Sequence, residues 1–271
     1  MQKIKNSILK TAMGILLIVV FIQKTEAQEQ ATAFLKDYYA VSAFGQYTRM
    51  KAGIVIKKNP TINYNVLSST TPQYGLLVNV YQTRHWNFKT GVLLKPQVLT
   101  EEFNFTREQT GLDFDYSYQT SLSGDETVWS IPLIAEFVIP INKHIKWMVA
   151  PSFSISNYQY FGGSGLTVID DARMDFIRDD RSDKPLHTSA EISTGFYILF
   201  KHFMLQPELR YSKSFNTYKT GSYIANNLTS INTTGTFSIS GDNWGFSLNI
   251  YVKKRGKNKP RKKKKKKRKK D

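Results

Sequence analysis

A two-residue alternation of apolar and polar side chains constrains this chain more than any other feature. From Trp244 to Val252 every second residue is large and apolar, and smaller or polar residues such as Ser247 and Asn249 lie between them. The segment from Trp147 to Ile155 follows the same pattern. Alternation over this length predicts a β-strand with one apolar face. The small and polar second face fits a narrow lumen better than the core of two packed sheets.

Eight segments between residues 40 and 252 show this pattern, and helical signals are nearly absent, with only residues 28–36 resembling a helix. Many of the segments reach the length of a transmembrane strand, about 9–11 residues, whereas strands of globular proteins average about 5–6. The predicted strands are residues 40–56, 73–82, 86–98, 128–140, 145–158, 188–200, 203–216 and 243–252.

The connections between these segments alternate strictly between short and long. The short ones are residues 83–85, 141–144 and 201–202, and the long ones are residues 57–72, 99–127, 159–187 and 217–242. Bacterial outer-membrane barrels have short periplasmic turns and long extracellular loops. No later segment has the roughly 18 consecutive apolar residues of a membrane-spanning helix. We therefore expect an all-β fold, an eight-stranded antiparallel transmembrane β-barrel over residues 40–252, with both ends on the side of the short turns.

Tryptophan and charge positions add two expectations. The four tryptophans stand at or next to predicted strand starts, on the apolar face, and are expected to form the aromatic girdles of the two membrane boundaries: Trp86, Trp129, Trp147 and Trp244. The alternative is that they are core aromatics of a soluble β-sandwich.

Six charged residues fall on the inward face, where they are expected to pair as a structural plug or, alternatively, to line a gated channel: Lys89, Lys95, Glu136, Glu191, Glu208 and Arg210.

The two ends of the chain carry its entire net charge of +17. Residues 1–27 hold +3 and have the basic, apolar and small-residue regions of a cleaved secretory signal, with residues 28–39 as a lead-in to the barrel. Residues 253–271 hold +14, and the remaining residues sum to zero. The chain has no cysteine.

The C-terminal run is expected to be disordered, because like charges repel and bury no apolar surface. We expect it to contact an anionic periplasmic partner, such as cell wall, lipid head groups or an acidic protein. The alternative is that the tail only deters aggregation or assists assembly. Its densest part is Lys262, Lys263, Lys264, Lys265, Lys266, Lys267 and Arg268. Aromatic residues are not interleaved with it and the body is neutral, so no nucleic-acid partner is expected.

Three segments resemble a known family. Residues 128–136 (VWSIPLIAE), 146–153 (KWMVAPSF) and 204–211 (MLQPELRY) are similar to strands of the PorT-like porin family group, small outer-membrane barrels of the Bacteroidota. The polybasic tail departs from the usual family ending, in which the last strand closes the chain. The resemblance implies a barrel of the outer membrane, in some members an accessory to protein secretion.

Catalytic signals are weak. Three of the four histidines fall in predicted short turns, and only His187 lies on the extracellular side, where a hydrolase or acyltransferase would need it. Acidic residues in 159–187 alternate with arginines and lack calcium-loop spacing. We expect no catalytic residues, no metal and no cofactor. The expected role is a non-enzymatic scaffold or interaction module for secretion or envelope maintenance, with a narrow solute channel as the alternative and an outer-membrane enzyme as a third possibility.

Overall fold

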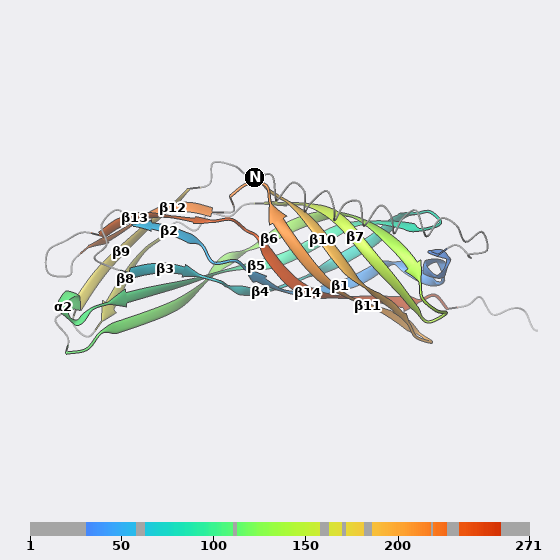
Figure 1. Cartoon of the computed structure of the whole chain (residues 1–271), viewed down its shortest axis with the longest axis horizontal. Coiled ribbons are helices and arrows are strands. Elements are labelled where there is room, and N and C mark those ends of the chain that lie inside the picture. The colour runs from blue at the N-terminus through green and yellow to red at the C-terminus, as the bar shows by residue number, and fades with distance from the viewer. Residues whose placement is uncertain are drawn as a thin grey trace, which may run out of the picture.

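The computed structural model contains a closed barrel of eight antiparallel strands, which confirms the predicted fold class (Figure 1). It describes residues 31–57, 63–110, 113–157, 163–169, 172–181, 186–217, 219–226 and 233–255. The pairing of β5 with β6 closes the sheet. The barrel strands are β1 (Tyr38–Met50), β4 (Thr70–Gln82), β5 (Trp86–Phe105), β6 (Tyr116–Pro140), β7 (Ile145–Asn157), β10 (Leu186–Leu199), β11 (Phe203–Ser214) and β14 (Asn243–Lys253).

The alternation in the sequence sorts the side chains between the two faces of the barrel. In β14, Trp244, Phe246 and Ile250 are exposed on the outer surface, whereas Ser247 and Asn249 are fully buried in the lumen. The interior holds such polar side chains together with a cluster of buried apolar ones. A belt of exposed apolar side chains on the outside is what a barrel in lipid requires, because the lipid chains offer no hydrogen bonds.

The connections expected to be long loops contain further strands, which the prediction missed. These are β2 (Ile54–Lys57), β3 (Asn63–Leu67), β8 (Gly163–Ile169), β9 (Ala172–Arg181), β12 (Lys219–Asn226) and β13 (Thr233–Ile239). All but β3 form a second sheet in the order β2-β13-β12-β9-β8. These strands are short or rich in polar residues, so they lack the long apolar face that marks the barrel strands.

Strands β5 and β6 also extend well past their predicted limits. Their extensions pair with each other from Val98 and Ser123 to Phe105 and Tyr116, and the short helix α2 (Arg107–Thr110) follows at the tip. With β3 and the second sheet, these extensions form a loop-side lobe, which occupies the left of Figure 1. The predicted limits were wrong because the apolar outer face stops at the barrel while the strand pairing continues.

The loop-side lobe has an aromatic core of its own. Tyr64 and Phe103 pack with Tyr223 and Phe237, so residues from β3 and β5 meet residues from the second sheet. The phenol of Tyr64 donates a 2.7 Å hydrogen bond to Glu101, which is also buried. The lobe is therefore a packed unit and not a set of open loops.

The opposite end of the barrel, the turn end, carries the short turns 83–85, 141–144 and 200–202, at the right of Figure 1. The 3-10 helix η1 (Ala33–Asp37) packs at this end of the barrel, and we call it the plug. Leu35 is buried in the barrel core, and Phe34 contacts the Tyr197 ring edge-on at 5.2 Å. The Thr32 amide donates a 3.3 Å hydrogen bond to the Arg84 carbonyl, and the Thr32 hydroxyl donates to the Thr83 carbonyl.

Residues 28–36 were the one segment with a helical pattern in the sequence. Among the described residues of this segment, the structure contains the 3-10 helix η1. The predicted signal, residues 1–27, and the densest part of the tail, Lys262 to Arg268, lie outside the described residues. Of the helices that the structure describes, none is long and apolar enough to cross a membrane.

Candidate functional site: the barrel lumen

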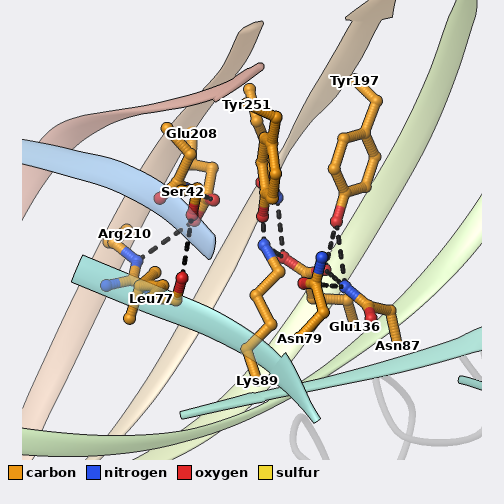
Figure 2. A network of polar contacts seen from close by, with 12 residues as sticks. Ser42, Leu77, Asn79, Asn87, Lys89, Glu136, Tyr197, Glu208, Arg210 and Tyr251 are labelled. Atoms are coloured by element: carbon orange, nitrogen blue, oxygen red, sulfur yellow. Dashed lines mark hydrogen bonds and ion pairs between the residues drawn. The ribbon is translucent and has the colours of Figure 1, made fainter. Parts of the chain in front are cut away.

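A deeply buried ion pair of the lumen joins Lys89 of β5 to Glu136 of β6 (Figure 2). The Lys89 ammonium lies 2.5 Å from Glu136 Oε1, and neither side chain has more than 1% of its surface exposed. Both residues alternate with outward apolar residues on strands that pair directly. The strand register therefore brings their side chains into the same narrow interior.

Neutral side chains complete the hydrogen bonding of this pair. Glu136 Oε1 also accepts from Gln206 at 2.7 Å, while Oε2 accepts from Asn87 at 2.7 Å and from the Tyr197 hydroxyl. Lys89 donates a second bond, at 2.8 Å, to Gln206. Burying charges is tolerated only when such partners replace water, and here both carboxylate oxygens have two donors each.

Two tyrosine rings flank the Lys89 ammonium. The centroids of Tyr197 and Tyr251 lie 5.4 and 5.3 Å from its nitrogen, within the range of cation–π attraction. Tyr197 also contacts Phe34 of the plug. The plug, the aromatic rings and the ion pair thus form one continuous packed layer across the turn half of the lumen.

A second charged cluster lies further toward the loop end. Arg210 Nε is 3.2 Å from Glu208 Oε2, and Arg210 Nη1 is 3.8 Å from Glu191 Oε2. Asn249 donates a 2.7 Å hydrogen bond to Glu208. Arg210 Nη2 is buried without a hydrogen-bond partner, as are the hydroxyls of Ser193 and others nearby. This cluster is less completely satisfied than the Glu136 cluster.

The loop half of the lumen contains a cavity of about 50 Å³. Lys95, Glu191 and Arg210 line it, together with His187 and several serine and threonine hydroxyls. A water molecule needs about 10–15 Å³ of such space, so the cavity has room for a few waters. The structure thus places all six predicted charged residues on the inward face but divides them between two clusters.

Several interior residues were missed by the sequence analysis. Asn87, Tyr197, Gln206 and Tyr251 all bond within the Glu136 cluster. Their signal was available, since Asn87 stands two residues before Lys89 and Gln206 two before Glu208, on the same strand face. They were overlooked because uncharged residues do not stand out on an inward face.

The tryptophans lie on the outer surface of the barrel. Trp86 follows turn 83–85 directly, Trp147 is the third residue of β7, and Trp244 is the second residue of β14. Trp129 lies well inside β6, opposite Leu94, because β6 begins in the lobe. Its expected position at a strand start was therefore wrong, although it sits where β6 enters the barrel.

The histidine of interest for catalysis contacts a serine. His187 Nε2 is 3.1 Å from Ser214 Oγ at the loop end. The nearby carboxylate of Asp242 instead accepts from Lys213 at 2.5 Å and from the Ser214 amide at 3.1 Å. Burial alone would raise the pKa of Asp242, but these two hydrogen bonds, together with the positive charges of Lys213 and Lys51, hold the pKa below its ordinary value. Among the described residues, no group of three or more metal-ligating side chains occurs.

Comparisons with known proteins give only distant structural similarity. No family model matches the chain. No curated protein matches it either. Among solved structures, the outer membrane protein OprG from Pseudomonas aeruginosa aligns with 80% of this chain and 97% of its own, at 9% identity and a TM-score of 0.41.

The outer membrane protease OmpT from Escherichia coli aligns with 79% of this chain and 95% of its own, at 9% identity and a TM-score of 0.30. An outer membrane channel from Pseudomonas putida F1 covers the same shares at 11% identity and a TM-score of 0.25. The closed strand order, the apolar outer belt and the buried polar groups of the lumen define the architecture of an eight-stranded transmembrane β-barrel.

Proposed function

We propose that this protein is a non-enzymatic outer-membrane barrel that acts as a scaffold or interaction module, accessory to protein secretion or envelope maintenance. The export signal would direct it across the inner membrane, and the turn end, with both chain ends, would face the periplasm. The PorT-like grouping that three of its strands suggest is part of this proposal.

One observation carries the proposal: the layer formed by the plug, Tyr197 and the Lys89–Glu136 pair. Leu35 is 2% exposed and Glu136 is 1% exposed, so the described residues leave little free space in the turn half of the lumen. A filled interior favours a structural role for the barrel. Its interaction surfaces would then be the loop-side lobe and the turn end.

Conductance in planar bilayers tests this proposal. The mature protein should show no defined single-channel steps. A variant without residues 31–37 serves as the comparison, because it removes the plug but none of the side chains that bond to Glu136. Steady channel conductance of the mature protein would refute the scaffold assignment.

The cavity beside Lys95 and the buried unpartnered atoms around Arg210 favour a second candidate, a narrow channel for small solutes. In that case Glu136→Ala should raise conductance, since it would remove the acceptor that closes the turn half.

The contact of His187 with Ser214 justifies protease, phospholipase and acyltransferase assays of the mature protein and of His187→Ala. We expect no activity in either.

The cationic tail would tether the barrel to an anionic partner in the periplasm. Co-sedimentation with cell wall and with anionic vesicles, at low and high salt, tests this with the mature protein and a chain ending at Arg255. We expect the mature protein to bind these anionic surfaces less at high salt, because salt screens the charges, and the shortened chain to bind them less than the mature protein. Equal binding of both forms would reject it.

A further inference from the structure

The turn end of the barrel concentrates positive charge on the folded part of the chain. We define the turn rim as residues 36–37, 83–85, 141–146, 200–202 and 253–255. Each short turn contains a basic residue followed by a histidine: Arg84–His85, Lys143–His144 and Lys201–His202. The other cations of the rim are Lys36, Lys146, Lys253, Lys254 and Arg255.

Within these ranges Asp37 is the only acid, so the rim has a net charge of +7. The rim residues before residue 253 are net positive, although residues 28–252 as a whole sum to zero. The remaining residues of the body must therefore be net negative, so positive charge is concentrated at one end of the barrel axis. The loop-side end is mixed in sign, since Arg49, Lys51 and Lys213 occur there with acids such as Glu101 and Asp242.

Backbone hydrogen bonds hold the rim in a closed ring. The carbonyl of the histidine in each turn accepts from the neighbouring strand, at 2.8, 2.8 and 2.9 Å: Val138 to His85, Leu199 to His144, and Lys253 to His202. The Lys254 amide then donates to the Asp37 carbonyl at 2.8 Å. The cations are thus distributed around the circumference on a preformed backbone.

The depth of the rim in a membrane follows from its aromatic neighbours. Trp86 and Trp147 face outward beside the turns, and the apolar side chains of Ile141, Phe200 and Phe203 are exposed nearby. Tryptophan prefers the head-group level of a bilayer. Exposed cations one to four residues beyond the tryptophans, such as Lys143, therefore lie at the level of lipid phosphates.

We propose that the turn rim binds the head groups of anionic phospholipids in the leaflet that it faces. This proposal rests on the proposed membrane location but is independent of the tail beyond residue 255. A Lys or Arg at an anionic membrane surface gives about a fivefold preference, so several around one ring select anionic lipid. A ring at phosphate depth fits a surrounding lipid annulus better than a soluble acidic protein, which would contact one face.

The tryptophans allow the two ends to be measured separately. One form retains only the turn-side pair (Trp129→Phe, Trp244→Phe), and the other retains only the loop-side pair (Trp86→Phe, Trp147→Phe). Each form is reconstituted in phosphatidylcholine vesicles with a minority of phosphatidylglycerol. Bromine is placed on the chains of one lipid or the other, and fluorescence quenching reports which lipid surrounds each pair.

We expect the turn-side pair to sense at least about twice the bulk fraction of phosphatidylglycerol, and the loop-side pair to sense the bulk fraction. High salt and the double variant Lys143→Gln, Lys201→Gln should reduce the turn-side enrichment. The matched control Arg49→Gln, Lys51→Gln removes two cations from the loop end and should leave it unchanged. A chain ending at Arg255 should retain the enrichment.

Loss of enrichment on this truncation would assign the effect to the tail and overturn the proposal for the rim. Equal enrichment at both pairs, or no response to Lys143→Gln, Lys201→Gln, would also overturn it. If neither pair were quenched by either lipid, the membrane location itself would fail, and the proposed function would fail with it.

Discussion

The two halves of the lumen solve the same problem differently. In the turn half, both carboxylate oxygens of Glu136 accept hydrogen bonds, and the plug occupies the space beside them. In the loop half, Arg210 has a buried nitrogen without a hydrogen bond, and a cavity remains. In this barrel the buried charge is fully surrounded where long side chains such as Gln206 and Tyr197, together with the apolar cluster around Met148, stand beside it. Small hydroxyl residues in the same positions leave room for water.

The largest effect should come from removing the centre of the turn half. Glu136→Ala leaves the Lys89 ammonium buried without its counter-ion and is expected to lower the free energy of unfolding by about 3–5 kcal/mol. Urea unfolding of the reconstituted protein, followed by tryptophan fluorescence, measures this. Glu191→Gln is the control in the loop half, where the ion contact is 3.8 Å and partly exposed, and should change stability by less than about 1 kcal/mol. Similar effects of both variants would break the comparison.

The plug should respond next. Leu35→Ala removes a side chain that is buried among the barrel core residues and should weaken local closure of the mouth by about 2–3 kcal/mol. Hydrogen exchange at the amides of Thr32 and Leu35, both of which donate hydrogen bonds, reports this opening. Lys36→Ala is the matched control, since that side chain is exposed. Unchanged protection in Leu35→Ala would show that the plug does not depend on this contact.

A smaller loss is expected in the loop half. Arg210→Gln leaves Glu208 with its hydrogen bond from Asn249 and with water from the adjacent cavity, so we expect a loss of about 1–2 kcal/mol. The same urea titration measures it. A loss as large as that of Glu136→Ala would mean that the two clusters are equally closed to water.

The smallest effect is a pH dependence outside the lumen. Because the pKa of Asp242 is lowered in the folded protein, its contribution to stability is present above the unfolded pKa, about 3.9, and is lost as pH falls through the lower folded value. Asp242→Asn should flatten the acid limb of the stability curve in that window. An unchanged acid limb would show that the carboxylate contact with Lys213 does not stabilise the fold.

The barrel could be predicted from the sequence because its strands have one continuous lipid-facing side. Alternation in residues 243–252 and 145–158 therefore gave strand limits close to those of β14 and β7. The lobe could not be predicted in this way, because strands such as β2 and β12 are short and their partners lie far away in the sequence: β2 pairs with β13, and Tyr223 of β12 packs on Tyr64. The inward direction of the charged side chains could be predicted, because alternate residues of a strand point to the same face. Their division into two clusters could not, because it depends on the register and shear of the closed barrel, which bring together residues as distant in sequence as Lys89 and Gln206.

The hairpin of β5 and β6 has a mechanical consequence. Strand β6 is 25 residues long, so at about 3.3 Å per residue it spans roughly 80 Å from the tip of the lobe to the opposite rim. Lys89 and Glu136 sit on the two arms of this hairpin, far from its tip. A load applied to the tip would travel along the two paired arms, through the register shift between Pro96 and Val98, to the buried ion pair.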